Sequence, residues 1–501
     1  MHDATMRRST TATRPRRALA ALLALALTSV GAVVPGGAAG AAPPDGCGTR
    51  SRAVGSTGAL SDVVDQIGAR ELWCQGVTGE SVTVAVIDTG VVPVPALSEA
   101  GKVATVVDLS REATVPDVAF LDTYGHGTHM AGIIAGRDPG ADPAARRVGP
   151  GFLGVAPDAH LVSVKVADHT GAVDVSQVIA GLDWVVEHKD LLGVRVLNLS
   201  YGTDSTQGYQ VDPLAHAVER AWRAGIVVVV AAGNDGRGTS RLANPALDPF
   251  VIAVAAAQSR DGGFVVPSWV TSGDGTRNPD VSAPGVSVEG LRAPGSRIDV
   301  EHPDARVGVD RFLGSGSSQA AAVTSGAVAL LLDARPGLTP DEVKAILRQT
   351  AVPFQNGHER FQGRGLISLP RALAAPAGAS ATQTAVPSSG SGSLEASRGS
   401  AHVDFDGTVL IGEVTAHGAT WGPWHGPRWS GVPVPGVVNR DGVVWSGFSL
   451  RASSWRGVPW RVGSWTAEDW QGASWREGSW SGASWRGAWW RGSNWSGVGW
   501  R

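Results

Sequence analysis

The chain has 501 residues, which is long enough for two or three domains with at least one large hydrophobic core. Its formal net charge is −3, so the composition gives no electrostatic reason to expect nucleic acid or an acidic surface as a partner. Function therefore has to be inferred from the motifs and their spacing.

The first 41 residues have the composition of a signal peptide. Five arginines lie between positions 7 and 17, the apolar run Ala18–Val34 follows, and small residues precede Ala41. A membrane anchor is the alternative, but the run is short for a bilayer span and is interrupted by polar residues and glycine. We expect cleavage after Ala41 and export, which places the mature protein outside the cell, either secreted or at the cell surface.

Residues 42–80 are expected to lead into the main domain, with helical spacing of apolar residues in Ser61–Trp73. The two cysteines of the chain, Cys47 and Cys74, both lie in this lead-in. Export makes a disulfide between them reasonable, and two free buried thiols are the alternative. The disulfide would tie the mature N-terminus to the segment that enters the first strand.

Strand and helix patterns alternate over residues 81–375, which we expect to form one domain. The first strand is Val82–Asp88, whose near-continuous apolar run is typical of a parallel strand buried on both faces. The other expected strands are Ala159–Val166, Val194–Leu199, Ile226–Ala231 and Phe250–Ala257, and the main helices are Val175–His188, Pro213–Ala224 and Pro340–Thr350. This alternation predicts an α/β fold with a doubly wound parallel sheet.

Two polar residues follow expected strands. Asp88 stands at the carboxyl end of the first strand, and Asn234 lies in the turn after Ile226–Ala231. Functional sites of open α/β sheets form at this edge. A helix cap is the alternative role for Asp88, and a plain turn residue is the alternative for Asn234.

Two further residues begin expected helices. His126 lies between Gly125 and Gly127, which allow close approach of the backbone. A metal site shared with His129 is disfavoured, because no carboxylate or cysteine accompanies the pair at ligand spacing, so metal ligands remain unassigned. Ser318 ends a Gly/Ser turn before a run of small and apolar residues, where helix N–H groups would stabilise negative charge.

Together these four residues supply each part that acyl transfer by a serine needs. Ser318 would attack a carbonyl carbon, His126 would accept its proton and return it to the leaving group, and Asp88 would orient the imidazole. Asn234 and the N–H of Ser318 would bind the oxyanion. The order Asp, His, Ser along the chain matches the subtilisin order of such triads.

The motifs of residues 60–373 resemble those of the subtilisin-like serine peptidases, the S8 family. The matching stretches are VAVIDTGV (84–91), HGTHMAG (126–132), LNLSYG (197–202), AAGN (231–234) and GSSQAAA (316–322). This resemblance implies a seven-stranded parallel sheet flanked by helices and endopeptidase activity on polypeptides.

The same resemblance implies which residues bind the substrate. One segment would pair with the substrate backbone as an added strand. Another would form the wall of the pocket for the residue before the cleaved bond. These segments are Ser200, Tyr201 and Gly202 for the added strand, and Ala231, Ala232 and Gly233 for the pocket wall.

Three positions around the nucleophile depart from the family motif, which usually reads Gly-Thr-Ser-Met-Ala-x-Pro. Here Ser317, Gln319 and Ala322 replace the threonine, methionine and proline. None of these changes removes a reacting group. Because Ser317 is adjacent, Ser318 is assigned as the nucleophile by its position in the motif. The lead-in is also too short for the folded inhibitory prodomain that many relatives carry.

The C-terminal part differs in composition. Residues 376–400 are rich in Ala, Ser, Gly and Pro and are expected to be a linker, and residues 401–501 a β-rich and tryptophan-repeat region. From Trp455 to Trp500 a tryptophan occurs at every fifth residue, which resembles the tryptophan-repeat tails of some bacterial secreted subtilisin-like proteins. A structural solenoid and a contact with cell-wall polysaccharide are the two interpretations.

The favoured hypothesis is a secreted serine endopeptidase that forms an acyl-enzyme and requires no cofactor for its chemistry. The alternative is a surface binding or structural protein with a vestigial peptidase domain, and an esterase with the same triad is a third reading. Calcium is often bound in this family, but no acidic loop is dense enough to assign its ligands.

Overall fold

The computed structural model describes residues 58–115, 118–145, 151–239, 241–376, 381–400, 402–405, 408–416 and 420–421. The expected signal peptide, Cys47 and the repeat from Trp455 onward lie outside these residues, so the signal peptide, the disulfide to Cys74 and the repeat stay predictions. Within the described ranges, none of the helices combines the length and apolar character that a bilayer span requires.

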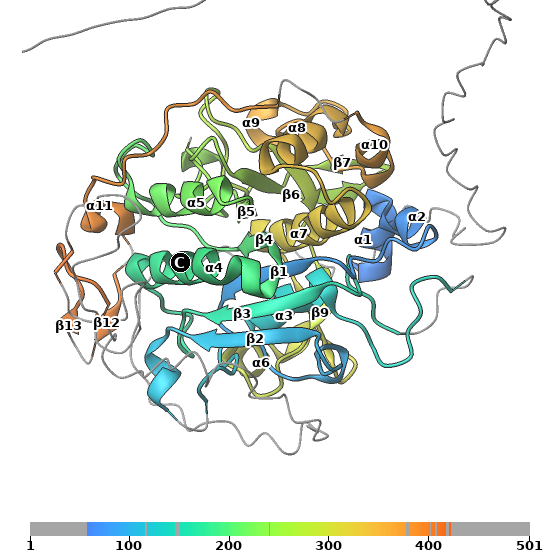
Figure 1. Ribbon diagram of the computed structural model, residues 1–501, viewed down its shortest axis with the longest axis horizontal. Helices are drawn as coiled ribbons and strands as arrows, with labels where there is room; N and C mark the ends of the chain where they lie inside the picture. The colour runs from blue at the N-terminus through green and yellow to red at the C-terminus, as the bar shows by residue number, and fades with distance from the viewer. Residues whose placement is uncertain are drawn as a thin grey trace, which may run out of the picture. The chain divides into compact units, whose positions relative to one another are not determined.

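One twisted sheet forms the centre of the domain, in the order β2-β3-β1-β4-β5-β6-β7, with β8 also paired to β6 (Figure 1). Seven of its eight strands in the described part of the chain run parallel, and β7 is antiparallel to β6. The bounds are β1 Thr83–Asp88, β2 Val103–Asp108, β3 His160–Lys165, β4 Val194–Leu199, β5 Val227–Ala231, β6 Ile252–Arg260, β7 Gly263–Val265 and β8 Val281–Pro284.

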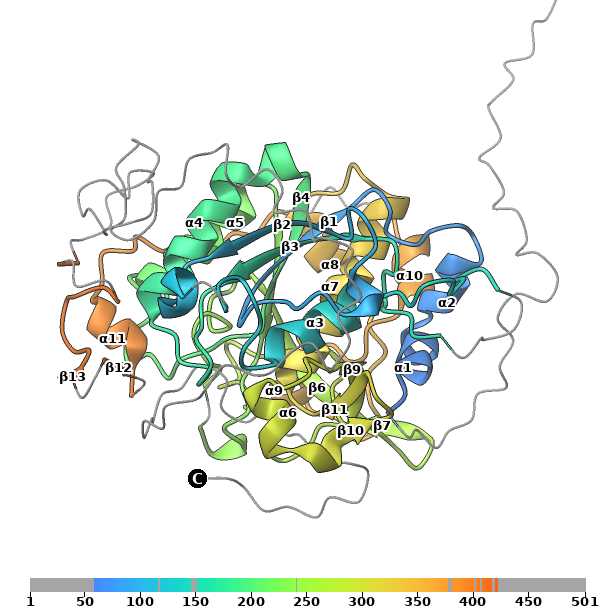
Figure 2. The ribbon, with the colours of Figure 1, turned by 90° about the horizontal axis from the view of Figure 1, so that it is seen from below.

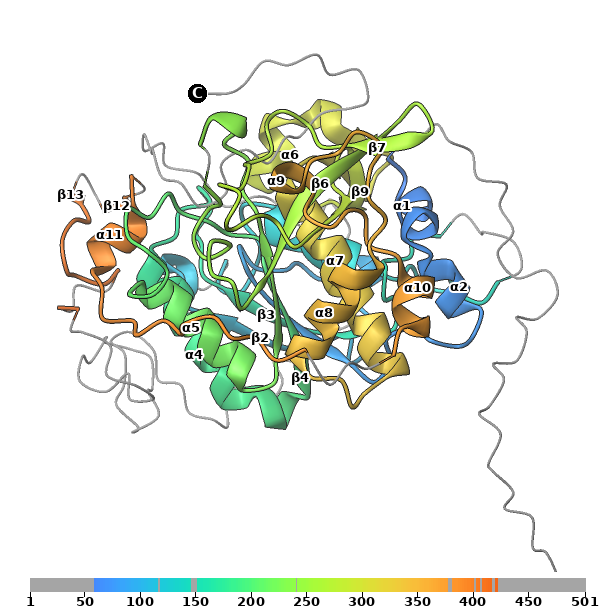
Figure 3. The ribbon, with the colours of Figure 1, turned by 90° about the horizontal axis from the view of Figure 1, so that it is seen from above.

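Helices cover both faces of this sheet, as the alternating pattern predicts. Helices α4 (Val175–Leu192) and α5 (Pro213–Arg223) pack together on one face, and α3 (His126–Ala135) and α7 (Ser317–Ala334) pack together on the other (Figures 2 and 3). The apolar side chains of β1, β4 and β5 are almost fully buried between these layers. Burial on both faces explains why these strands read as continuous apolar runs in the sequence.

The remaining elements are short and lie around this core. The helices are α1 Leu60–Ile67, α2 Ala69–Trp73, α6 Arg297–Glu301, α8 Pro340–Thr350, α9 Glu359–Gln362, α10 Leu369–Ala374 and α11 Leu394–Arg398, and the strands are β9 Val288–Leu291, β10 Arg306–Val307, β11 Arg311–Gly314, β12 Asp404–Phe405 and β13 Thr408–Val409. Strands β12 and β13 pair antiparallel within the region expected to be β-rich.

Three features differ from the sequence-based expectation. Ser61–Trp73 forms two helices, because Gly68 takes a left-handed conformation (φ 76°) that ends α1. The edge strand β2 was not expected, since its middle residues are partly exposed and the pattern is weak. The segment expected to be a linker carries α11 and packs on the domain, with Leu394 and Arg398 fully buried.

Candidate active site

Asp88 and His126 form a buried pair where β1 ends and α3 begins. The Nδ1 atom of His126 lies 2.8 Å from Oδ1 and 3.0 Å from Oδ2 of Asp88. Asp88 is 1% exposed and His126 is fully buried. Burial raises the pKa of Asp88, and the contact with His126 and the N–H of Thr89 oppose that rise. The carboxylate is therefore placed to fix which imidazole nitrogen carries the proton.

His129, one turn further along α3, is not suited to proton transfer. Its side chain is almost fully buried, and burial lowers its pKa to about 3. A general base near neutral pH needs a higher pKa than this. Within the described residues, no three His, Cys, Asp or Glu side chains converge as a metal site requires, and calcium ligands stay unassigned.

A second carboxylate, which the sequence analysis did not single out, holds the first turn of α3. Asp122 is fully buried and accepts hydrogen bonds from the N–H groups of Gly125 (2.6 Å) and Thr128 (2.7 Å). Its Oδ1 also accepts the hydroxyl of Thr89 (2.7 Å). Because Thr89 directly follows Asp88, Asp122 ties the helix that carries His126 to the strand that carries Asp88.

Gly127 allows α3 to approach β1 this closely. A Cβ atom at this position would lie 2.1 Å from the carbonyl oxygen of Gly90, which is far inside van der Waals contact. The N–H of Gly127 instead donates to the hydroxyl of Thr89 (2.8 Å). The glycine beside His126 is therefore needed for the distance between the imidazole and Asp88.

A buried ion pair lies behind this contact. The Nζ of Lys165, at the end of β3, lies 2.9 Å from Oε2 of Glu112 and donates to the carbonyl oxygens of Thr89 (3.0 Å) and Leu121 (2.8 Å). Burial alone would raise the pKa of Glu112, but hydrogen bonds from His169 and Thr123 and the charge of Lys165 lower it to about 2. The sequence signal was a lysine within the apolar strand AHLVSVKV.

The other half of the site lies where β5 ends and α7 begins. Oδ1 of Asn234 accepts hydrogen bonds from the N–H (2.8 Å) and the hydroxyl (2.9 Å) of Ser317. A backbone N–H can only donate, so the amide oxygen of Asn234 must face Ser317 and its NH₂ group must face away. This orientation leaves the two amide donors on the side opposite Ser317.

Ser317 and Ser318 have different surroundings. The hydroxyl of Ser317 is fully buried, donates to Asn234 and accepts the N–H of Gly233 (3.1 Å). The hydroxyl of Ser318 makes a long hydrogen bond of 3.4 Å to the carbonyl oxygen of Ser200, and both serines line the same cavity. Of the two serines, Ser318 has the less engaged hydroxyl, as expected for the residue assigned as nucleophile.

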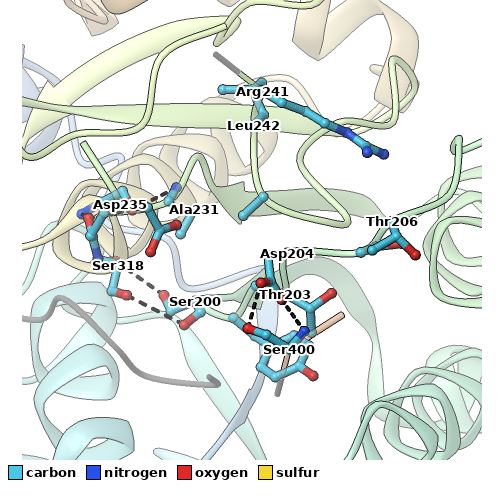
Figure 4. Close-up of a pocket in the computed structure, with 17 residues that line it drawn as sticks. Ser200, Thr203, Asp204, Thr206, Ala231, Asp235, Arg241, Leu242, Ser318 and Ser400 are labelled. Atoms are coloured by element: carbon cyan, nitrogen blue, oxygen red, sulfur yellow. Dashed lines mark hydrogen bonds between the residues drawn. The ribbon is translucent and has the colours of Figure 1, made fainter. Parts of the chain in front are cut away.

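A cavity of about 580 Å³ opens beside Ser318 (Figure 4). Its lining includes most of the residues expected to bind substrate. Ala232 is different: it is fully buried, its N–H donates to Val254 and its carbonyl accepts the N–H of Ala243, so it lies behind the wall. The expected residues that line the cavity are Ser200, Tyr201, Gly202, Ala231, Gly233 and Asn234.

Comparison with known proteins shows the family of this chain. Residues 79–365 match the model of the subtilase family, Peptidase_S8. The chain is 37% identical over 308 residues to serine protease AprX of Bacillus subtilis (strain 168), covering 59% of this chain and 66% of that protein. It is 34% identical over 311 residues to subtilisin E of the same organism, covering 61% and 69%.

A solved structure gives the same relationship. The crystal structure of fervidolysin from Fervidobacterium pennivorans, described as a keratinolytic enzyme related to subtilisin, matches with a TM-score of 0.52 and 29% identity. The match covers 66% of this chain and 49% of fervidolysin, so the two proteins share a domain rather than their whole length. The family match covers more than half of the chain, and the chain therefore belongs to the subtilase family of serine peptidases.

Proposed function

We propose that this protein is a serine endopeptidase that cleaves polypeptides through Asp88, His126 and Ser318. The Oγ of Ser318 attacks the carbonyl carbon while His126 Nε2 takes its proton. The tetrahedral intermediate then collapses, the C–N bond breaks, and the proton passes to the leaving amine. A water molecule then attacks the acyl-enzyme with the help of the same base, and the carboxylic acid product is released from Ser318. The chemistry therefore needs no cofactor.

The observation that carries this proposal is that each half of the site holds one of its groups in a fixed orientation. His126 is already held by Asp88 at 2.8 Å, and Asn234 is already turned so that its amide donors face away from Ser317. Groups that are fixed before reaction need no reorganisation when charge develops on the substrate oxygen. The N–H of Ser318, in the first turn of α7, is the proposed second oxyanion donor.

The test is casein hydrolysis and labelling with a serine-directed fluorophosphonate, comparing Ser318→Ala with Ser317→Ala. We expect the wild-type protein to cleave casein and to take the label, and Ser318→Ala to do neither. Ser317→Ala should keep the label and part of the activity. Full activity in Ser318→Ala, or loss of labelling only in Ser317→Ala, would contradict the assignment.

The same assays address the other two readings. A vestigial peptidase domain on a surface binding or structural protein would give neither casein cleavage nor labelling. An esterase would take the label and cleave a small ester while leaving casein intact. The family membership and the preset site favour the endopeptidase.

We also propose export, guided by the signal-peptide pattern of residues 1–41 and by a relative named minor extracellular protease Epr. For the tryptophan repeat the favoured role is a structural solenoid, with contact to cell-wall polysaccharide as the alternative. Deleting residues 422–501 and measuring retention on cell-wall material distinguishes the two. The truncation is placed after Trp421 so that the carbonyl oxygens of Gly412 and Val414, which accept hydrogen bonds from Arg398, are retained.

A further inference from the structure

The C-terminal segment 388–400, called the strap below, lies beyond the family match, which ends at residue 365. Its α11 buries Arg398, whose Nε lies 2.5 Å from Oδ2 of Asp174, with neither side chain exposed. Asp174 also caps the N-terminus of α4. A buried pair of this kind cannot lose one partner without leaving an uncompensated charge, so the strap is anchored in the domain.

From this anchor the strap runs along one wall of the cavity. The carbonyl oxygen of Ser397 accepts the hydroxyl of Thr203 (2.6 Å), and the carbonyl oxygen of Ala396 accepts the N–H of Thr206 (3.0 Å). Thr203 and Thr206 both line the cavity. The wall segment that begins at Ser200 is therefore held from outside by residues that the family domain does not contain.

The last strap residue fixes a carboxylate on that wall. The N–H of Ser400 donates to Oδ1 of Asp204 (2.7 Å) and its hydroxyl donates to Oδ2 (2.5 Å), and both residues line the cavity (Figure 4). Gly399 makes this possible, because its φ is 65° and a Cβ there would lie 2.2 Å from Oδ1 of Asp204. Each carboxylate oxygen keeps further acceptor capacity after one such bond.

The other charged residues of the lining are Asp235 and Arg241. Arg241 donates its guanidinium to the carbonyl oxygen of Gln207, and Figure 4 shows this side chain extending away from Ser318. Asp235 comes directly after Asn234, on the opposite wall from Asp204. The space between Ser318 and Asp204 thus has carboxylates on both walls, while the cation of the lining is bound elsewhere.

We propose that Asp204, held by the strap through Ser400, is a specificity-determining residue that selects a lysine or arginine side chain for the position before the cleaved bond. The cavity beside the nucleophile receives that side chain, and its ammonium or guanidinium group binds the fixed carboxylate. Asp235 adds to the negative potential from the other wall. This inference rests on the proposed function, because it names the substrate class of the same site.

The test uses two peptides that differ only in having lysine or leucine before the cleaved bond. The readout is the ratio of their kcat/KM values, with active sites counted by fluorophosphonate titration. The wild-type protein should prefer the lysine peptide, and Asp204→Asn should lower the ratio roughly tenfold or more, the size expected for losing a contact to a charged group. Ser400→Ala should lower it several-fold and Ser400→Thr should restore it.

Ser389→Ala is the matched control, because this exposed strap serine binds the carbonyl oxygen of Gln210 and does not line the cavity. Its ratio should equal that of the wild type. The inference is overturned if the enzyme takes the fluorophosphonate label but prefers the leucine peptide, or if Asp204→Asn leaves the ratio unchanged. Either result leaves the proposed function standing. Loss of both labelling and peptide cleavage in the wild type would instead reject the proposed function, and the inference with it.

Discussion

The two halves of the site are built from different kinds of interaction. The half around Asp88 and His126 contains buried charge: Glu112 and Lys165 form an ion pair behind it. The half around Ser318 holds its groups with neutral hydrogen bonds, such as those from Ser317 to Asn234.

This difference follows from what each half must do. In the proposed mechanism the imidazole gains and loses a proton in every cycle, so its neighbours must hold it in place while the charge changes. The oxyanion exists only during reaction. Neutral hydrogen-bond donors can stay in place between reactions without the cost of burying an unpaired charge. Variants in the first half should therefore affect stability as well as rate, and variants in the second half mainly the rate.

The largest expected effect is that of His126→Ala. Without the base, the hydroxyl of Ser318 keeps its proton, and kcat should fall by roughly 10⁶-fold, the scale known for the related triad of subtilisin. Peptide hydrolysis with titrated protein is the measurement. His160→Ala, on a surface-facing histidine bound to the carbonyl oxygen of Gly101, should retain wild-type rates. A loss below tenfold in His126→Ala would remove His126 from the mechanism.

The next largest effect is that of Lys165→Met, which tests how much the buried charge around Asp88 and His126 contributes to stability. The change leaves Glu112 and Asp108 buried without their cation and should cost about 3–5 kcal/mol of unfolding free energy. Urea unfolding in a Ser318→Ala background, which removes self-digestion, measures it. Lys189→Met, whose partner Asp190 is 89% exposed, should cost less than about 1 kcal/mol. Equal effects of the two variants would contradict the role of Lys165.

Asn234→Ala tests the neutral half. Removing one oxyanion donor should lower kcat by roughly 10²–10³-fold while KM changes little, as in the subtilisin example of this effect. The unfolding midpoint in urea should stay close to that of the parent, because only neutral hydrogen bonds are lost. A large loss of stability with an unchanged kcat would reverse the assignment of the two halves.

The acid sensitivity of the first half follows from Glu112. Its pKa is about 2 in the folded chain against an ordinary 4.5, so its stabilisation is complete above about pH 4.5 and is lost as the pH falls towards 2. The shift corresponds to about 3 kcal/mol. The unfolding free energy, measured between pH 2 and 5, should rise with pH less steeply in Glu112→Gln than in the parent protein. Glu359→Gln is the control, because Glu359 forms an exposed pair with Arg364, and it should keep the pH dependence of the parent.

Ser317→Ala should have the smallest effect. The N–H of residue 317 still binds Oδ1 of Asn234, but the bond from the hydroxyl is gone, and the amide is held less firmly. We expect kcat to fall roughly fivefold, which corresponds to the loss of one hydrogen bond of about 1 kcal/mol. Ser317→Thr should recover the rate. A failure of threonine to recover it would mean that the hydroxyl does not position Asn234.

Sequence reasoning found the elements that carry a strong local signal. The apolar runs of β1, β4 and β5 predicted the parallel sheet, because strands buried on both faces have no room for polar side chains. It missed the edge strand β2 and the boundary at Gly68, where the apolar pattern alone does not define the element. It also interpreted residues 376–400 as a linker, because composition does not show what the buried Arg398 will contact.

The sequence by itself determined the kind of fold and the choice of Asp88, His126, Asn234 and Ser318 as candidate site residues, since residue type and periodicity are properties of the chain. The tertiary structure alone decided which groups meet: Asp122 with the first turn of α3, Lys165 with Glu112, and Ser400 with Asp204. The physical reason is that these partners are distant in sequence. Their contacts depend on how β1, β3 and the strap pack, and no local pattern encodes that packing.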